Sequence, residues 1–202
     1  MVKVKICGIR RIEDVYMMNE LKPDYVGFVF AESKRKVSIE EAERLSRELD
    51  KDIKKVGVFL EQDLNFIKAA FEKARLDIIQ LHGENQEVYC KSIDFGEVWR
   101  AVRISSVEDI ENIKREAAAG ILLDSKIEGS YGGSGKSFEW KVAEDIGKSQ
   151  KIILAGGLNE SNVKEGIRIV KPYAVDVSSG VEVNGFKDYE KCKSFIRKVK
   201  EA

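Results

Sequence analysis

The chain has 202 residues, which is long enough for one well-buried domain or two small ones. Its 35 basic and 35 acidic residues balance, so the charge indicates neither a nucleic-acid partner nor a membrane-surface partner. No apolar run approaches the ~20 residues that span a bilayer, and no signal-peptide segment opens the sequence, so we expect a cytoplasmic protein.

Short β-branched runs alternate with amphipathic stretches eight times along the chain. In chain order, strands are expected at 2–6, 25–30, 55–60, 77–81, 97–102, 120–124, 151–155 and 173–178. Helices are expected between them at 12–21, 38–49, 63–74, 85–93, 106–117, 138–147, 160–170 and 188–202. Capping-box pairs at Ser38 with Glu41, and more weakly at Ser106 with Asp109, indicate two of the helix starts.

Eight strand–helix units imply a parallel sheet, because successive parallel strands need helical crossovers. We therefore predict an α/β fold, a single-domain (β/α)8 TIM barrel over residues 1–202. The alternative is a doubly wound open sheet. It would normally have fewer units and a glycine fingerprint after its first strand, where this chain has only Gly8.

Three cysteines, Cys7, Cys90 and Cys192, are widely spaced and form no CxxC pair. Their odd number argues against disulfides, and the single histidine argues against a zinc site. Barrel enzymes carry their catalytic groups at the carboxyl ends of the strands. Cys7 and Asp124 stand at such ends, whereas Cys90 and Cys192 fall inside expected helices and are interpreted as packing residues.

Alternation in the first strand places Lys5 and Cys7 on the face opposite Val4 and Ile6. If the apolar pair meets the surrounding helices, Lys5 points into the barrel beneath Cys7. A buried ammonium needs a partner. We predict an ion pair with Asp176 on the neighbouring eighth strand.

Three glycine-rich segments follow the last three strands: YGGSGKSF (131–138), AGGLNESN (155–162) and SSGVE (178–182). The first is a near miss for a nucleotide loop, because Ser130 stands where a Walker motif needs its first glycine. Such loops either form tight turns or bind phosphate through backbone N–H groups. Three of them at successive strand ends favour a phosphate site.

Several motifs are spread over essentially the whole chain: KICGI (5–9), SKRKVS (33–38), QLHG (80–83), LLDS (122–125), YGGSGKSF, LAGGLN (154–159) and DVSSGVE (176–182). Together they resemble the phosphoribosylanthranilate isomerase family of tryptophan biosynthesis. The resemblance implies a single-domain barrel that needs no cofactor. It also implies an Amadori rearrangement of N-(5-phosphoribosyl)anthranilate, a phosphosugar, to 1-(2-carboxyphenylamino)-1-deoxyribulose 5-phosphate.

The resemblance also implies roles for individual residues. Cys7 would be the general base, Asp124 the general acid and Arg35 the group that binds the anthranilate carboxylate. His82 would line the site or only cap a turn, and Asp176 would line it. The phosphate-binding residues would be Gly133, Ser134, Gly135, Gly156, Gly157, Ser178, Ser179 and Gly180. Arg10 departs slightly from the pattern, since relatives often have a small hydroxyl residue there.

The chemistry requires opposite tuning of the two catalytic groups. A thiol of ordinary pKa ~8.5 gains from anything that lowers its pKa. An aspartic acid of ordinary pKa ~3.9 must be kept protonated by burial or a nearby negative charge.

Three other functions compete with the isomerase. The related isomerase of histidine biosynthesis has an aspartate where this chain has Cys7, and indole-glycerol-phosphate synthases usually have an extension before the first strand. A phosphosugar-binding module without catalysis would have lost the acid or the base. The presence of Cys7 and Asp124 together favours the isomerase, as a monomer or homodimer.

Overall fold

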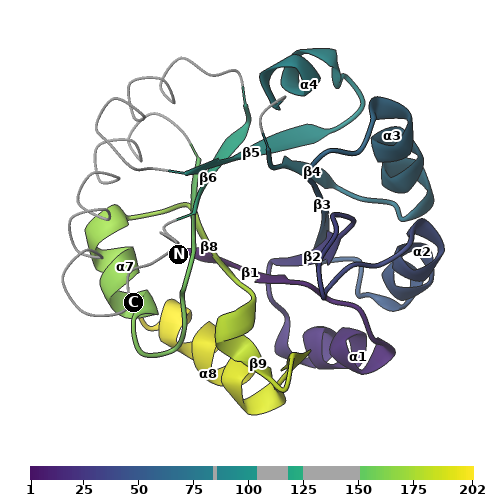
Figure 1. Ribbon diagram of the computed structural model, residues 1–202. Helices are drawn as coiled ribbons and strands as arrows, with labels where there is room; N and C mark the ends of the chain where they lie inside the picture. The colour runs from purple at the N-terminus through teal and green to yellow at the C-terminus, as the bar shows by residue number, and fades with distance from the viewer. Residues whose placement is uncertain (84–85, 104–117, 125–150) are drawn as a thin grey trace.

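The computed structural model describes residues 1–83, 86–103, 118–124 and 151–202 (Figure 1). The helices expected at 106–117 and 138–147 lie outside the described residues, and so do the Ser106 cap and the phosphate-site candidates Gly133, Ser134 and Gly135.

Eight parallel strands close into a barrel, each hydrogen-bonded to the next in chain order (Figure 1). They are β1 (Lys3–Cys7), β2 (Tyr25–Val29), β3 (Lys54–Phe59), β4 (Ile78–Leu81), β5 (Glu97–Arg103), β6 (Gly120–Asp124), β7 (Ile152–Ala155) and β8 (Ala174–Val177). β1 pairs with β8, with Lys5 opposite Asp176, so no open edge remains. The predicted barrel is confirmed, and the open sheet is excluded.

The described helices surround the strands (Figure 1). They are α1 (Ile12–Leu21), α2 (Ile39–Glu48), α3 (Leu64–Lys73), α4 (Gln86–Ser92), α7 (Val163–Val170) and α8 (Tyr189–Lys200). The predicted capping box of α2 is present, with Ser38 accepting from the Glu41 N–H at 3.1 Å and Glu41 from the Ser38 N–H at 2.7 Å. Within the described residues, none of the helices has the length and apolar character to cross a membrane.

The helix expected at 160–170 begins later, at Val163. Asparagine side chains hold the preceding residues in a turn, because Asn159 Oδ1 accepts from the Ser161 N–H at 2.8 Å and Asn162 Oδ1 from the Asn159 N–H at 2.9 Å. Such local hydrogen bonds compete with helical ones.

A two-stranded hairpin, β9 (Glu182–Val183) and β10 (Phe186–Lys187), follows β8 and was not expected. Its turn residues Asn184 and Gly185 have positive φ angles of 50° and 80°. An Asn-Gly pair is a strong hairpin signal, so this element was readable in the sequence.

Side chains alternate across the barrel wall as the first strand predicted. Val4 and Ile6 pack in the apolar cluster between strands and helices, while Lys5 is fully buried in the interior. Trp99 fills the lower interior with 0% exposure, next to Tyr25. The interior is therefore closed below and can hold a site only above.

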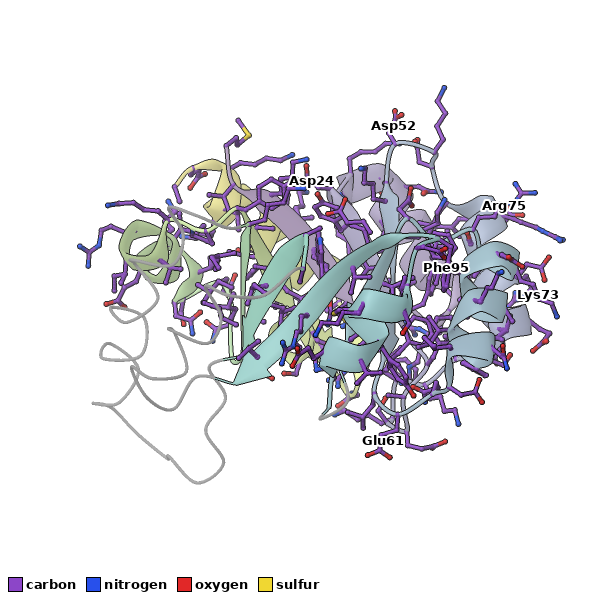
Figure 2. The ribbon with its side chains drawn as sticks, turned by 90° about the horizontal axis from the view of Figure 1, so that it is seen from above. Asp24, Asp52, Glu61, Lys73, Arg75 and Phe95 are labelled. Carbon is purple, nitrogen blue, oxygen red and sulfur yellow. The ribbon has the colours of Figure 1, made fainter. Side chains whose placement is uncertain are left out.

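The two ends of the barrel are identified in Figure 2. Asp24 and Asp52, which precede β2 and β3, lie at one end, and Glu61, which follows β3, lies at the other. The Glu61 end is the carboxyl end of the strands, where barrel enzymes place their active sites.

Candidate active site

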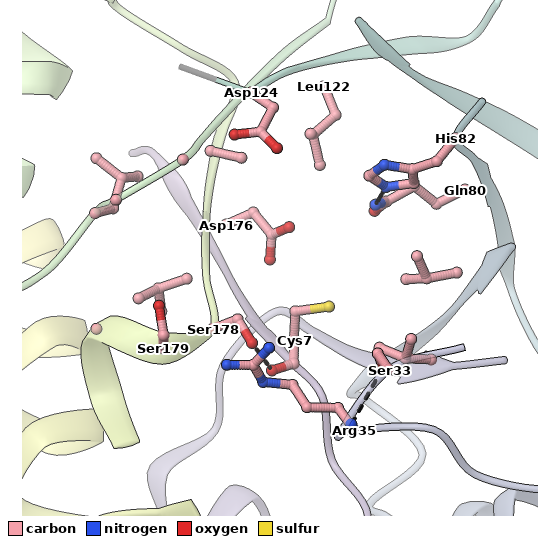
Figure 3. Close-up of a pocket in the computed structure, with 18 residues that line it drawn as sticks. Cys7, Ser33, Arg35, Gln80, His82, Leu122, Asp124, Asp176, Ser178 and Ser179 are labelled. Carbon is pink, nitrogen blue, oxygen red and sulfur yellow. Dashed lines mark hydrogen bonds between the residues drawn. The ribbon is translucent and has the colours of Figure 1, made fainter. Parts of the chain in front are cut away.

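A cavity of about 300 Å³ lies at the carboxyl ends of the strands (Figure 3). It brings together every described member of the predicted site: Cys7, Arg35, His82, Asp124, Gly156, Gly157, Asp176, Ser178, Ser179 and Gly180. Within the described ranges, no three His, Cys, Asp or Glu side chains gather as the ligands of a metal ion would.

Strand alternation explains how these side chains converge. Residues two apart on a strand share a face, so Asp124 follows the interior Leu122, and Ser178 follows the interior Asp176. Each of these polar groups lies two residues nearer the carboxyl end of the barrel than an interior side chain. The sheet therefore positions Cys7, Asp124 and Asp176, whereas Arg35 and the glycine-rich segments reach the cavity from loops.

The predicted pair of Lys5 and Asp176 is confirmed. Lys5 Nζ donates to Asp176 Oδ2 at 2.9 Å, and the two side chains are 0% and 9% exposed. Burial alone would lower the pKa of Lys5, but the charges of Asp176 and Cys7 raise it above its ordinary value. The second oxygen, Asp176 Oδ1, is buried and accepts no hydrogen bond from the part of the chain that the structure describes.

The Cys7 thiol is 8% exposed and packs with Val29 and Val58. Burial raises the pKa of this thiol above its ordinary value, and the Asp176 charge adds to the rise, while the Lys5 and Lys187 ammonium groups oppose it. A Cβ atom on the neighbouring Gly27 would lie 2.8 Å from Cys7 Sγ, so a glycine is required beside the thiol.

Asp124 ends β6 and is only partly buried. Figure 3 shows its carboxylate and the Cys7 thiol reaching the cavity from different strands, with Asp176 between them in that view. A potential acid and a potential base thus face one space.

Arg35 lies on the loop after β2 and forms a two-point ion pair. Its Nε and Nη2 donate to the two carboxylate oxygens of Glu182 at 2.7 Å and 2.8 Å. Lys187, 1% exposed, donates to the same carboxylate at 2.8 Å. No role was predicted for Glu182 or Lys187, because no local sequence pattern indicates that Arg35 contacts Glu182, 147 positions away.

His82 lines the cavity. Its Nε2 lies 2.6 Å from Nε2 of Gln80, which is two residues earlier in the chain. Gln80 is 2% exposed, and its Oε1 accepts no hydrogen bond from any described residue. Gln80 was missed, although it shares a strand face with His82.

The loops after β7 and β8 meet closely at the cavity. Gly156 and Gly157 have φ angles of 82° and 65°, which residues with a side chain rarely adopt. A Cβ atom on Gly180 would lie 2.0 Å from the carbonyl oxygen of Leu158. The Ser178 hydroxyl donates to the Cys7 carbonyl at 3.0 Å, so its proton is not directed at the cavity.

The fold and the cavity define a class: a (β/α)8-barrel enzyme with a thiol and a carboxyl group facing one cavity at the carboxyl ends of its strands. A family model described as N-(5'phosphoribosyl)anthranilate (PRA) isomerase matches residues 4–198. The chain belongs to this family, and its activity is the isomerisation of phosphoribosylanthranilate in tryptophan biosynthesis.

Individual relatives agree with the family match. The N-(5'-phosphoribosyl)anthranilate isomerase of Thermoanaerobacter pseudethanolicus is 52% identical over 99% of this chain and 98% of its own. The Clostridium acetobutylicum isomerase is 48% identical over 99% and 98%. The crystal structure of the Thermotoga maritima isomerase superposes with a TM-score of 0.91 at 41% identity, covering 100% of both chains.

A further solved structure carries a ligand. It is a phosphoribosylanthranilate isomerase in complex with reduced 1-(o-carboxyphenylamino)-1-deoxyribulose 5-phosphate. Its TM-score to this chain is 0.88 at 37% identity, with 100% of both chains covered. The substrate of the present chain is accordingly a small molecule.

Proposed function

We propose that Asp124 and Cys7 carry out the two proton transfers of the isomerisation, as general acid and general base. The observation that supports this assignment is that both groups face one cavity from strands β6 and β1. Proton transfer by positioned side chains is the principal catalysis that such a reaction needs.

In the first step, protonated Asp124 donates its proton to the furanose ring oxygen. The bond between that oxygen and C1′ breaks, its electron pair becomes the new hydroxyl, and the anthranilate nitrogen forms a protonated imine. Asp124 is left as a carboxylate.

In the second step, the Cys7 thiolate removes the proton from C2′, and the C2′–H electron pair forms the enolamine as the imine is neutralised. The enolamine then tautomerises to the ketone. The Lys5 ammonium below the thiol is a fixed charge that favours the thiolate, and its pairing with Asp176 keeps that charge in place.

The same proposal assigns the binding groups. Arg35 binds the anthranilate carboxylate, because a guanidinium matches a planar carboxylate. Asp176 Oδ1 and His82 line the sugar. The phosphate lies against the backbone N–H groups of the glycine loops, which comprise Gly156, Gly157, Ser178, Ser179 and Gly180 together with Gly133, Ser134 and Gly135 outside the described residues.

We further propose that residues 1–202 form one domain that acts in the cytoplasm without a cofactor. The barrel is closed by pairing between β1 and β8, which supports a single unit. For the assembly we propose a monomer or a homodimer; the Thermotoga maritima relative is dimeric and has been obtained as monomers.

The test is to generate phosphoribosylanthranilate in situ and follow the loss of its fluorescence. We expect Cys7→Ser and Asp124→Asn each to lower kcat by roughly 10²- to 10⁴-fold. Cys90→Ser on α4 and Asp52→Asn, an exposed residue at the opposite end of the barrel, are matched controls and should keep wild-type rates.

The outcomes separate the assignments. Wild-type decay that survives Cys7→Ser would remove the base from the proposal and leave the isomerase activity intact. Wild-type decay that survives Asp124→Asn would remove the acid from the proposal in the same way.

A further inference from the structure

The guanidinium of Arg35 is held along one of its two hydrogen-bonding edges. Its Nε and Nη2 face Glu182 Oε1 and Oε2 at 2.7 Å and 2.8 Å. The Glu182 side chain is 6% exposed and that of Arg35 is 18% exposed. Two parallel hydrogen bonds to a buried carboxylate fix both the plane and the direction of a guanidinium.

The other edge of Arg35, formed by Nη1 and Nη2, donates no hydrogen bond to the described residues. Arg35 lines the cavity, and Figure 3 shows its guanidinium beside Cys7 and Ser178. A guanidinium has five N–H groups. A second planar carboxylate can therefore bind the remaining edge without displacing Glu182.

Glu182 does not neutralise the positive charge of Arg35 that would attract an anionic ligand, because Lys187 offsets the negative charge of Glu182. Lys187 Nζ lies 2.8 Å from Glu182 Oε1 and also donates to the Ser178 carbonyl at 3.0 Å. Burial by itself would raise the pKa of Glu182, but the hydrogen bonds from Arg35 and Lys187 lower it to about 2. Two cations and one carboxylate leave a net positive charge that includes the open edge of Arg35.

The loop that carries Arg35 and the β9–β10 hairpin that carries Glu182 are joined a second time by Arg10. Its Nη1 donates to the Lys34 carbonyl at 2.9 Å and its Nη2 to the Gly185 carbonyl at 3.0 Å. The Arg35 side chain also lies directly on Gly8, where an added Cβ atom would be 2.5 Å from Arg35 Cδ. The position of Glu182 relative to Arg35 is thus independently fixed.

We propose that Glu182, backed by Lys187, is a positioning residue that orients Arg35 so that its Nη1–Nη2 edge receives the ring carboxylate of the substrate. The inference rests on the proposed role of Arg35. The β9–β10 hairpin contacts no reacting atom in the proposed mechanism. Through Glu182 it would nevertheless contribute to the preference for a substrate with a ring carboxylate.

The experiment measures binding of two probes by titration calorimetry. One is reduced 1-(o-carboxyphenylamino)-1-deoxyribulose 5-phosphate, and the other is the same compound without its ring carboxylate. Wild type, Arg35→Ala, Glu182→Gln and the double variant are compared, with folding checked by circular dichroism. We expect Glu182→Gln to lower the preference for the carboxylated probe roughly 10- to 100-fold.

Coupling between the two residues is the decisive readout. Glu182→Gln should leave the affinity for the carboxylate-free probe nearly unchanged, and should have no further effect in the Arg35→Ala background. Equal weakening of both probes, or a further loss in that background, would overturn the inference. In turnover, the variant should raise KM for phosphoribosylanthranilate more than it lowers kcat.

Failure of the underlying assignment gives a different pattern. If Arg35→Ala keeps the preference for the carboxylated probe, the carboxylate role of Arg35 is wrong and the inference falls with it. If Arg35→Ala loses the preference while Glu182→Gln keeps it, only the inference is overturned.

A second variant covers the case in which Glu182→Gln does not fold. Glu182→Asp keeps a negative charge beside Lys187 but is one methylene too short to hold both Nε and Nη2 of Arg35. We expect this variant to show a smaller loss of preference in the same direction, and an unchanged preference would count against the proposal.

Discussion

The surroundings of Cys7 favour its neutral thiol over its thiolate. Its thiol lies among apolar side chains, and burial is the largest influence on its pKa, which is raised despite the Lys5 ammonium. A raised pKa leaves less thiolate at neutral pH, but the thiolate that forms is a stronger base. The fraction of Cys7 present as thiolate should therefore rise at a higher pH than for an ordinary thiol.

We expect the Cys7 thiol to ionise only above ~8.5, the ordinary thiol value, because burial raises its pKa. Thiolate absorbance measured against pH, as the difference between wild type and Cys7→Ser, checks this. Cys192 does not interfere, because burial raises its pKa to about 12. A Cys7 thiol that is already ionised below pH 7 would contradict the prediction.

Gly27 provides a second test at the thiol. In Gly27→Ala the new methyl group would lie 2.8 Å from Cys7 Sγ, so the thiol must move away from its position. We expect kcat to fall roughly 10- to 100-fold, since misplacement by about 1 Å can cost this much.

The matched control for Gly27→Ala is Gly57→Ala on β3. Its Cβ would lie 2.5 Å from Leu76 Cδ1, away from the cavity. Overpacking there should cost about 1–3 kcal/mol of stability and leave kcat unchanged. Equal kinetic losses in both variants would mean that Gly27 acts through stability alone.

Among the elements, the β9–β10 hairpin was not predicted from the sequence, and its Glu182 holds Arg35 at the cavity. Its Asn184–Gly185 turn allows the reversal, and Arg10 and Arg11 stack on its Phe186 at 4.5 Å and 4.2 Å from the ring centroid. Arg10, which departs from the family pattern, connects the Lys34 loop to the turn of the hairpin.

Helix α3 offers a prediction about stability without catalysis. Asp63 caps it by accepting from the Phe66 N–H at 2.9 Å. Asp63→Ala should lower the free energy of unfolding by about 1 kcal/mol, and Asp63→Asn should retain most of it, because an amide oxygen can also cap. Urea unfolding and the fluorescence assay would check both variants. A loss of kcat in Asp63→Ala would show that α3 affects the site.

For the molecule as a whole, closure of the barrel joins the two most distant strands of the sheet. β1 and β8 pair directly, and the Lys5–Asp176 ion pair is buried at that junction. The pair also connects the closure of the barrel to the candidate site, since Asp176 lines the cavity.

We expect Lys5→Met to destabilise the barrel by about 3–5 kcal/mol, because it leaves Asp176 buried without its partner. Replacing both residues, as Lys5→Met with Asp176→Leu, should restore much of the stability but not the activity. Urea unfolding of the two variants measures the difference. A double variant no more stable than Lys5→Met would contradict this account.

The sequence was sufficient for the barrel, since each expected strand is found within one residue of its predicted bounds. The Lys5–Asp176 pair was also predictable, because alternation and strand order together determine it. Glu182, Lys187 and Gln80 were not assigned, for a physical reason. A charged or amide side chain in a loop or at a strand end normally faces water, and only the closed fold reveals that these are buried.

The pairing of β1 with β8 also has a consequence for synthesis on the ribosome. Cys7 and Ser178, hydrogen-bonded to one another, are separated by 171 residues. At ~5–20 residues per second, the second appears roughly ten to thirty seconds after the first. During that interval the nascent chain holds the Lys5 ammonium without its counter-ion and the Cys7 thiol without its barrel. The Cys7 thiol is therefore open to solvent and to oxidants during synthesis, and it is buried only when the last strand completes the barrel.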